Sequence, residues 1–197
     1  MLHRFMRARP ARSEASDSQS TSVARWLLET SFLIVLAFTL AQGTRALAVQ
    51  PFVVPSGSMI PTIELQNRVL VEKVTYRFAR PPRQGEVVVF DNPNQANPKE
   101  KILIKRVIAT EGQCVDIRDG KVWVDGAELD EPYVHGKATT PGTISMPITI
   151  PVGEVWLMGD NRPRSGDSRL FGPQPVSKVR GRAVWTYWPL KEFGELE

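Results

Sequence analysis

A turn around residue 58 contains the residue types that a nucleophilic site needs. Residues 55–62 read PSGSMIPT, with Ser56 and Ser58 enclosed between two prolines. Because proline restricts the backbone and glycine relaxes it, this pattern favours a constrained turn over a helix or a strand. Such a turn can present one hydroxyl outward and direct backbone N–H groups at a developing oxyanion. The alternative for this segment alone is an ordinary linker with no chemistry.

A lysine in a strand-like segment could supply the base. Residues 101–108 read KILIKRVI, and side chains of a strand alternate between its faces. Lys105 therefore shares a face with Leu103 and Val107, while Arg106 faces the other way. Apolar surroundings disfavour a charged amine, so we expect the pKa of Lys105 to be lowered enough for it to act as a general base. The alternative is a solvated lysine that protects a sheet edge from aggregation.

A polar loop over residues 159–169 is the third segment that could carry chemistry. It reads GDNRPRSGDSR and contains charges of both signs. A hydroxyl here could orient a lysine amine, and aspartate–arginine pairs could fix the loop. The loop begins like a calcium site, but the twelfth position from Asp160 is Phe171 instead of glutamate. A surface turn held by ion pairs is the alternative interpretation.

Composition narrows the possible chemistry. The chain has two histidines, His3 and His135, and no HExxH motif, so the helical zinc-protease pattern is absent. Its one cysteine, Cys114, cannot form an internal disulfide. The net charge of +4 comes partly from N-terminal arginines, so nucleic-acid binding is not indicated. Serine with a base other than histidine is the leading catalytic option, without a metal or another cofactor.

The elements that must position these residues begin with an apolar segment. We predict a transmembrane helix over residues 23–49, preceded by a disordered tail over residues 1–22. Arginines in the tail place it in the cytoplasm and the rest of the chain outside. Two alternatives remain: a buried core helix, and a secretory signal cleaved after the small-x-small sequence that ends at Ala48.

The sequence after residue 50 has the pattern of a mainly β domain, either a sandwich or barrel-like. Short β-branched runs alternate with Gly, Pro, Asn and Asp, and two Asp-Gly pairs, at Asp119 and Asp125, predict hairpin turns. The runs that we predict as strands are 68–71, 86–90, 102–108, 114–117, 121–124, 154–158 and 181–188.

Together these motifs resemble the type I signal peptidases, a branch of the serine–lysine proteases known as family S26. The matching segments follow the apolar stretch in the family's order, and the resemblance extends from Trp26 to Leu190. Two departures, at residues 110–113 and at Pro163-Arg164, affect loops and no proposed catalytic group. The matching segments are 55–62, 68–73, 104–108, 159–162 and 165–169.

The resemblance implies a role for individual residues. Ser58 corresponds to the nucleophile and Lys105 to the general base, and Ser165 to the serine that orients the lysine amine. The hydroxyl of Ser56 and the backbone N–H of Ser58 correspond to the oxyanion hole. The residues that brace the site would be Asp160, Asp167 and Arg169. The residues that line pockets for small substrate side chains would be Val54, Met59, Ile63, Leu103 and Ile104.

The resemblance also implies an architecture and an activity. The expected fold is a membrane-associated β structure, with a catalytic β domain over residues 50–110 and 153–197 and an inserted β subdomain over 111–152. The expected activity is removal of signal peptides from exported preproteins after an A-x-A site. The protein would be a monomer in the bacterial cytoplasmic membrane, bound to the lipid bilayer and to no nucleic acid.

Two other functions stay open. One is a serine–lysine protease with a different target, such as a self-cleaving regulator. The other is a catalytically silent, anchored β domain that binds exported proteins. Substitution of Ser58 separates the second from an enzyme, because binding alone should survive the change.

Overall fold

The computed structural model describes residues 15–94 and 101–196, with side chains inside the first helix described for residues 23, 25–41 and 48. The chain divides into two compact units, Met1–Arg45 and Ala46–Glu197. The predicted tail over residues 1–22 lies mainly outside the described residues. Helix α1 (Ala15–Ala48) begins within the stretch predicted as tail, because adding residues to a formed helix is far easier than nucleating one.

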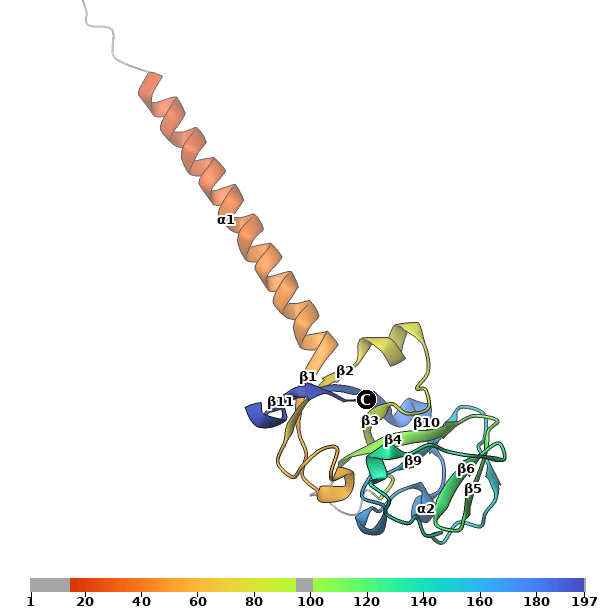
Figure 1. The fold of residues 1–197 in the computed structure, drawn as a ribbon. Coiled ribbons are helices and arrows are strands. Elements are labelled where there is room, and N and C mark those ends of the chain that lie inside the picture. Colours follow the sequence, from red (N-terminus) through yellow and green to blue (C-terminus); the bar gives the residue numbers. More distant parts are fainter. Residues whose placement is uncertain (1–14, 95–100, 197) are drawn as a thin grey trace, which may run out of the picture. The chain divides into compact units, whose positions relative to one another are not determined.

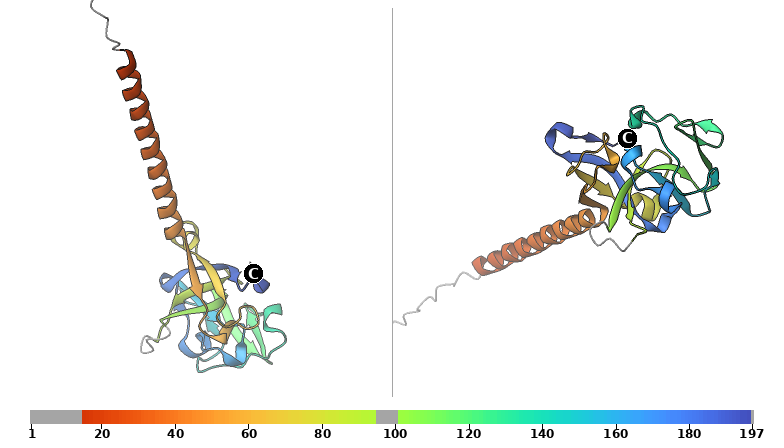
Figure 2. Two further views of the ribbon diagram at one scale, coloured as in Figure 1. Left: turned by 90° about the vertical axis from the view of Figure 1, so that its left-hand side faces the viewer. Right: turned by 90° about the horizontal axis from the view of Figure 1, so that it is seen from below.

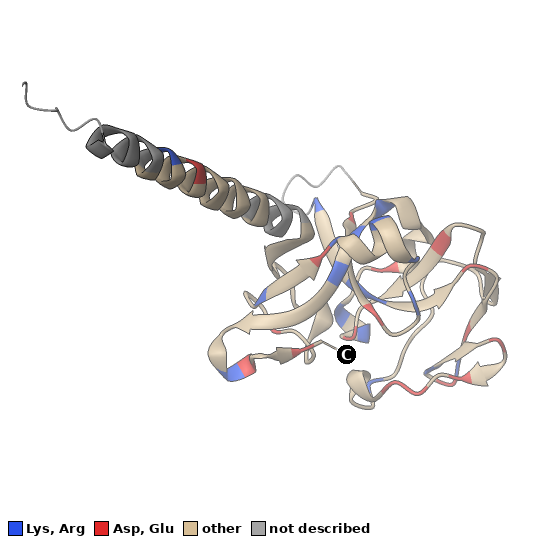
Figure 3. Ribbon diagram, turned by 90° about the horizontal axis from the view of Figure 1, so that it is seen from above, with Lys and Arg blue, Asp and Glu red and all other residues tan. Residues whose placement is uncertain are grey.

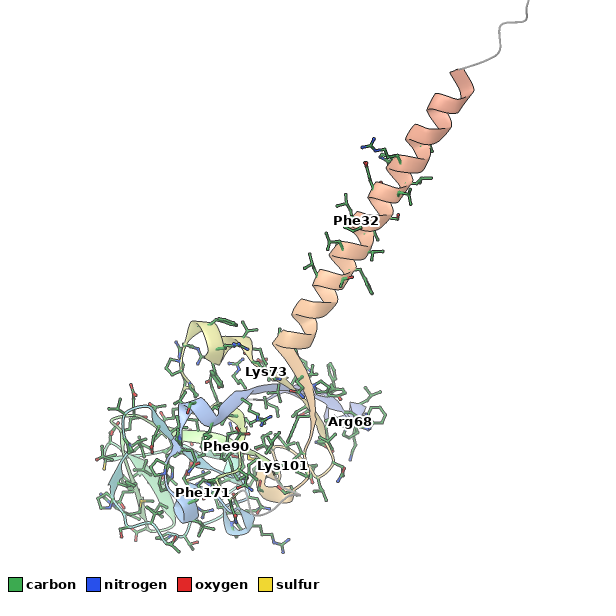
Figure 4. The ribbon with its side chains drawn as sticks, turned by 180° about the vertical axis from the view of Figure 1, so that it is seen from behind. Phe32, Arg68, Lys73, Phe90, Lys101 and Phe171 are labelled. Atoms are coloured by element: carbon green, nitrogen blue, oxygen red, sulfur yellow. The ribbon has the colours of Figure 1, made fainter. Side chains whose placement is uncertain are left out.

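Helix α1 carries mostly apolar side chains in its described part. Its charged residues with described side chains are Arg25 and Glu29, which form an i,i+4 ion pair with an N–O distance of 3.0 Å. Most of the described helix is tan in Figure 3. Figure 4 shows side chains near Phe32 projecting to either side of the helix. By length and apolarity, no helix within the described residues qualifies as a membrane span. The transmembrane helix therefore stays a prediction.

The second unit is built on an eight-stranded antiparallel sheet (Figure 1). The strand order is β1-β2-β11-β3-β4-β9-β10, and β12 pairs with β11. Register shifts interrupt the pairing of β11 with β2 and with β3, and such irregularities bend a sheet. The strands are β1 (Val49–Val53), β2 (Arg68–Glu72), β3 (Val87–Asp91), β4 (Ile102–Thr110), β9 (Glu154–Met158), β10 (Gln174–Pro175), β11 (Val179–Trp188) and β12 (Gly194–Glu195).

A smaller four-stranded sheet lies in sequence between β4 and β9. Its order is β7-β6-β5-β8, with β5 (Cys114–Arg118), β6 (Lys121–Val124), β7 (Ala127–Glu128) and β8 (Ile148–Thr149). It lies beside the β4–β9 side of the larger sheet (Figures 1 and 2). One apolar core joins the two sheets, because Ile108 of β4 and Trp156 of β9 pack with Val115 of β5 and Val122 of β6.

The prediction of a mainly β fold is confirmed. Each of the seven predicted runs contains a strand, and both Asp-Gly turns have the positive φ angles that a tight hairpin requires. Strand β1 was missed because Pro51 breaks the pattern of a central strand. Proline is tolerated at a sheet edge, and β1 is the terminal strand of its sheet.

Candidate active site

The serine turn connects β1 to β2. Ser56 is extended, and residues Gly57–Met59 then form a short 3₁₀ turn in which Ser58 and Met59 are buried. Met59 belongs to the apolar core between the strands, so the turn is fixed from beneath by packing. Ser58 is only 5% exposed, and its hydroxyl faces the strand that carries Lys105.

Lys105 of β4 contacts Ser58 directly. Its Nζ lies 2.6 Å from Ser58 Oγ and 2.9 Å from the Ile104 carbonyl oxygen. The side chain is 1% exposed and pairs across the sheet with Val88. Leu103 and Val107 follow the same strand face, as the alternation of side chains predicts. A nucleophile and a base at this distance can exchange a proton.

A cavity of about 460 Å³ opens at these two residues. Its remaining lining comes from the serine turn, from the ends of β3 and β4, and from the segment that follows β9. Helix α2 (Ser168–Phe171) closes one side, and Phe171 packs on Phe90 of β3 with ring centroids 6.3 Å apart (Figure 4). The lining residues besides Ser58 and Lys105 are Ser56, Gly57, Asn92, Asn94, Leu103, Arg164, Gly166, Leu170 and Phe171.

Asn161 ties the serine turn to the segment after β9. Its side-chain amide donates to the Gly57 carbonyl oxygen at 2.9 Å, and its backbone N–H donates to the Ser58 carbonyl oxygen at 3.0 Å. Gly159 also packs closely against the serine turn. A Cβ added at this position would collide with the Ser58 carbonyl oxygen and with Ser165. Only glycine fits without displacement, so this contact fixes where the two segments meet.

Asp160 is buried and accepts three hydrogen bonds from two residues. Arg106 donates to both of its carboxylate oxygens, at 3.0 and 2.8 Å, and Thr62 donates to Oδ2 at 2.5 Å. Arg106 follows Lys105 on β4 and also donates to the Gly85 carbonyl oxygen at 2.8 Å. The pair therefore joins the lysine strand to the segment that holds the serine turn.

A second buried ion pair shapes the loop that leads to α2. Asp167 accepts from the Arg169 guanidinium at 2.8 Å and from the Gly159 N–H at 3.1 Å. Arg169 also donates to the Arg162 carbonyl oxygen at 2.7 Å. Asp160, Asp167 and Arg169 are thus all held in buried ion pairs. That they brace the site stays a prediction.

Arg162 connects the same loop to the segment after β7. Its guanidinium donates to Thr139 at 2.7 Å and to both carboxylate oxygens of Glu131. Burial acts to lower the pKa of the Arg162 guanidinium. The hydrogen bonds and the negative charge of Glu131 outweigh that effect, so the pKa is raised. Burial also raises the pKa of Tyr133, and Glu131 raises it further. The Tyr133 ring lies 4.0 Å from the Arg106 guanidinium carbon.

The structure leaves Ser165 outside the contact between Lys105 and Ser58. The Ser165 hydroxyl is buried and has no hydrogen-bond partner in the described chain. Its role in orienting the lysine therefore stays a prediction. Ser56 does reach the nucleophile, because its hydroxyl donates to Ser58 Oγ at 3.4 Å.

The five predicted pocket residues separate into two groups. Leu103 lines the cavity beside Ser58. The other four lie in the core between the strands, with at most 1% of each side chain exposed, and do not line that cavity: Val54, Met59, Ile63 and Ile104. A direct substrate contact for these four stays a prediction.

Sequence reasoning missed several residues that hold the site together. Arg106 was assigned only to the opposite strand face, and Asn161 and Arg162 were part of the motif without a role. A buried arginine next to the lysine, matched by an aspartate in a later loop, is a signal that could have predicted the Arg106–Asp160 pair. Glu131 and Tyr133 gave no such signal, since they lie in a segment without a motif.

Comparisons with known proteins identify the family. Residues 24–188 match the family model described as signal peptidase, peptidase S26. The chain is 36% identical to the signal peptidase I of Leptolyngbya laminosa, over 95% of this chain and 91% of that protein. It is also 36% identical to the probable signal peptidase I-1 of Synechocystis, over 91% and 92% of the two chains.

A solved structure of a signal peptidase I from Enterococcus faecalis V583 matches with a TM-score of 0.45 and 27% identity, over 52% of this chain and 97% of that one. The family model covers most of the chain, and the two sequence relatives are aligned over nearly their whole lengths. The resemblance inferred from the serine, lysine and loop motifs is confirmed. The chain belongs to the signal peptidase family, peptidase S26.

Proposed function

We propose that this chain is a membrane-anchored serine endopeptidase that removes signal peptides from exported preproteins. The observation that carries the proposal is the 2.6 Å contact between Lys105 Nζ and Ser58 Oγ. Both side chains are buried and both line the cavity. Removal from water disfavours the charged form of an amine, and a neutral amine at this distance can accept the serine proton.

The proposed reaction starts with attack of Ser58 Oγ on the scissile carbonyl carbon, while the hydroxyl proton moves to neutral Lys105. The Ser56 hydroxyl and the Ser58 backbone N–H stabilise the tetrahedral oxyanion. The C–N bond then breaks, and Lys105 gives its proton to the leaving amine. Water attacks the resulting ester, Lys105 takes a proton from it, and that proton returns to Ser58.

The substrate would bind as an extended segment in the cavity. Extended peptides are recognised by backbone hydrogen bonds to a strand edge, with pockets for alternate side chains. Shallow apolar pockets would require small residues at the first and third positions before the cut, as in an A-x-A site. Leu103 is the predicted pocket residue that lines the cavity. Ser165 would orient the Lys105 amine once substrate displaces water.

We also propose that the apolar part of α1 holds the chain at a membrane. Large apolar side chains there are exposed, including Trp26, Phe32 and Phe38, and contact with lipid would remove them from water. The arginines of residues 4–12 favour a cytoplasmic N-terminus and a catalytic unit outside the bacterial cytoplasmic membrane. The enzyme would be a monomer. Because it would share one bilayer with its substrate, the effective concentration of substrate at the active site would rise.

Cleavage-site mapping tests the substrate and the reaction together. The full chain in detergent micelles is incubated with a preprotein that carries an A-x-A site, and the products are identified by mass spectrometry. We expect one cut directly after the second alanine by the wild type, and none by folded Ser58→Ala. A cut elsewhere would contradict the proposed specificity, and cleavage by Ser58→Ala would contradict the proposed nucleophile.

A further inference from the structure

Arg164 is fixed at the rim of the cavity that contains Ser58. It ends the short helix η4 (Arg162–Arg164), and its backbone N–H donates to the Asn161 carbonyl oxygen at 2.9 Å. Asn161 is itself bonded to the serine turn, and Arg162 is buried. The backbone of Arg164 therefore has little freedom relative to the nucleophile, although its side chain is exposed.

The charge of Arg164 is not neutralised by the cavity. Besides Lys105, which the proposed reaction uses as a neutral amine, the lining contains one basic side chain, Arg164, and no carboxylate. The two aspartates of the same loop, Asp160 and Asp167, are buried and each binds another arginine. Within residues 15–94 and 101–196, the Arg164 guanidinium makes no ion pair or hydrogen bond. A carboxylate brought by the substrate would find this guanidinium available.

The surroundings of Arg164 favour such an interaction. Leu103, Leu170 and Phe171 form an apolar side of the same cavity, and apolar surfaces strengthen the attraction between opposite charges by excluding water. A volume of about 460 Å³ is within the range typical of ligand sites. Because an extended chain advances about 3.3 Å per residue, substrate residues on either side of the scissile bond pass within reach of this rim.

We propose that Arg164 is a specificity-determining residue that selects substrates with an acidic side chain within about three residues of the scissile bond. A guanidinium binds a carboxylate through paired hydrogen bonds, and it repels a lysine or arginine at the same position. The inference rests on the proposed peptidase function. Arg164 would add a preference for acidic residues near the cut to the proposed preference for small residues at the first and third positions before it.

The test uses the full chain in detergent micelles with peptides that share one A-x-A site. A single residue is changed to Glu, Gln or Lys at each position that flanks the cut, leaving the two alanines intact. The measured quantity is the ratio of kcat/KM for the Glu peptide to that for the Lys peptide. Wild type is compared with Arg164→Gln, Arg164→Lys and Arg164→Glu, and with Arg83→Gln as a control arginine that does not line the cavity.

At one or two adjacent positions, wild type is expected to prefer Glu over Lys by roughly 3- to 10-fold. The preference should weaken as salt is added, disappear in Arg164→Gln, persist in Arg164→Lys and reverse in Arg164→Glu. Arg83→Gln should retain the wild-type ratio. A misfolded variant cannot mimic the reversal, because a general loss of activity changes both rates alike.

The outcomes separate this inference from the function on which it rests. If wild type cleaves the neutral Gln peptides after the A-x-A site without any charge preference, the specificity role of Arg164 is wrong and the peptidase function stands. Retention of the preference in Arg164→Gln would also overturn the inference. If wild type cleaves none of the peptides, the proposed function and the inference fall together.

Discussion

The Arg106 guanidinium binds the Asp160 carboxylate through two hydrogen bonds, with 2% and 0% of the two side chains exposed. One partner is the neighbour of Lys105 on β4, and the other precedes Asn161, which holds the serine turn. The pair therefore fixes the distance between the strand that carries the lysine and the segment that carries the serine. It is a structural link between two groups that must meet to react.

Removal of one charge from this pair should destabilise the fold strongly. Asp160→Asn leaves the Arg106 guanidinium buried without its counter-charge, which typically costs about 3–5 kcal/mol. The free energy of unfolding from urea titration measures the loss. Asp116→Asn serves as the control, because its partner Arg118 is half exposed, and such pairs contribute less than about 1 kcal/mol. Equal losses in the two variants would contradict the importance assigned to the buried pair.

Asn161→Ala should reduce turnover more than stability. The change removes the amide that donates to Gly57, so the serine turn loses one of its attachments and Ser58 shifts relative to Lys105. A displacement of about 1 Å can cost on the order of 100-fold in rate, and we expect kcat to fall by about 10- to 100-fold with KM nearly unchanged.

The control for Asn161 is Asn67→Ala, which removes a buried amide that binds Glu192 away from the cavity. It should lower the unfolding free energy and leave kcat unchanged. If both variants lose kcat equally, the attachment of Asn161 to the turn has no special role.

Ser165 offers a test in which stability and activity separate. Its buried hydroxyl has no partner within the described residues, so Ser165→Ala should leave the unfolding free energy unchanged or raise it by up to about 1 kcal/mol. The proposed role in orienting Lys105 predicts that kcat nevertheless falls by about 10-fold or more.

The matched control is Ser168→Ala. The Ser168 hydroxyl accepts from the Leu157 N–H at 2.9 Å, so its removal should lower stability by about 1–3 kcal/mol. A Ser165→Ala enzyme with normal kcat would remove Ser165 from the mechanism.

Glu86 should make stability depend on pH in the acid range. Burial acts to raise the pKa of Glu86, but hydrogen bonds from Arg80, Arg83, Tyr76 and Arg182 outweigh it and lower the pKa to about 2. Because the folded pKa lies below the unfolded value, this stabilisation is complete above about pH 5 and is lost as the pH falls towards 2.

The contribution of Glu86 at neutral pH is at most about 3 kcal/mol. Unfolding free energies of wild type and Glu86→Gln should therefore converge between pH 5 and 2. The matched control is Glu64→Gln, because Glu64 is exposed and lies outside this hydrogen-bond network. Parallel curves for wild type and Glu86→Gln over this window would contradict the assignment.

Local patterns predicted the strands, and the family resemblance assigned roles to Ser58 and Lys105, but neither predicted the network around them. Alternation of side chains identified β4 and placed Lys105 on an apolar face, and prolines around Ser58 predicted a turn. These signals act within a few residues. The contacts of Arg162 with Glu131 join segments 31 positions apart, and nothing in the local sequence specifies such a pairing.

Pocket residues were harder to predict for a related reason. Met59 and Ile63 have the side chains expected of an apolar pocket, and the same side chains suit a core. Which one they form depends on how β1, β2 and β4 close over them, and the structure places both in the core. A buried hydroxyl such as that of Ser165 is equally hard to predict, because its partners depend on the packing of the whole loop.

The central claim is that Ser58 and Lys105 act as one catalytic unit. The most direct test measures kcat/KM for preprotein cleavage by Ser58→Ala, by Lys105→Met and by the double variant, each shown to be folded by thermal unfolding. We predict that each single change lowers activity by at least about 1,000-fold and that the double variant is no worse than either, because residues of one unit are not additive. Near-normal cleavage by folded Lys105→Met, or losses that multiply in the double variant, would contradict the account.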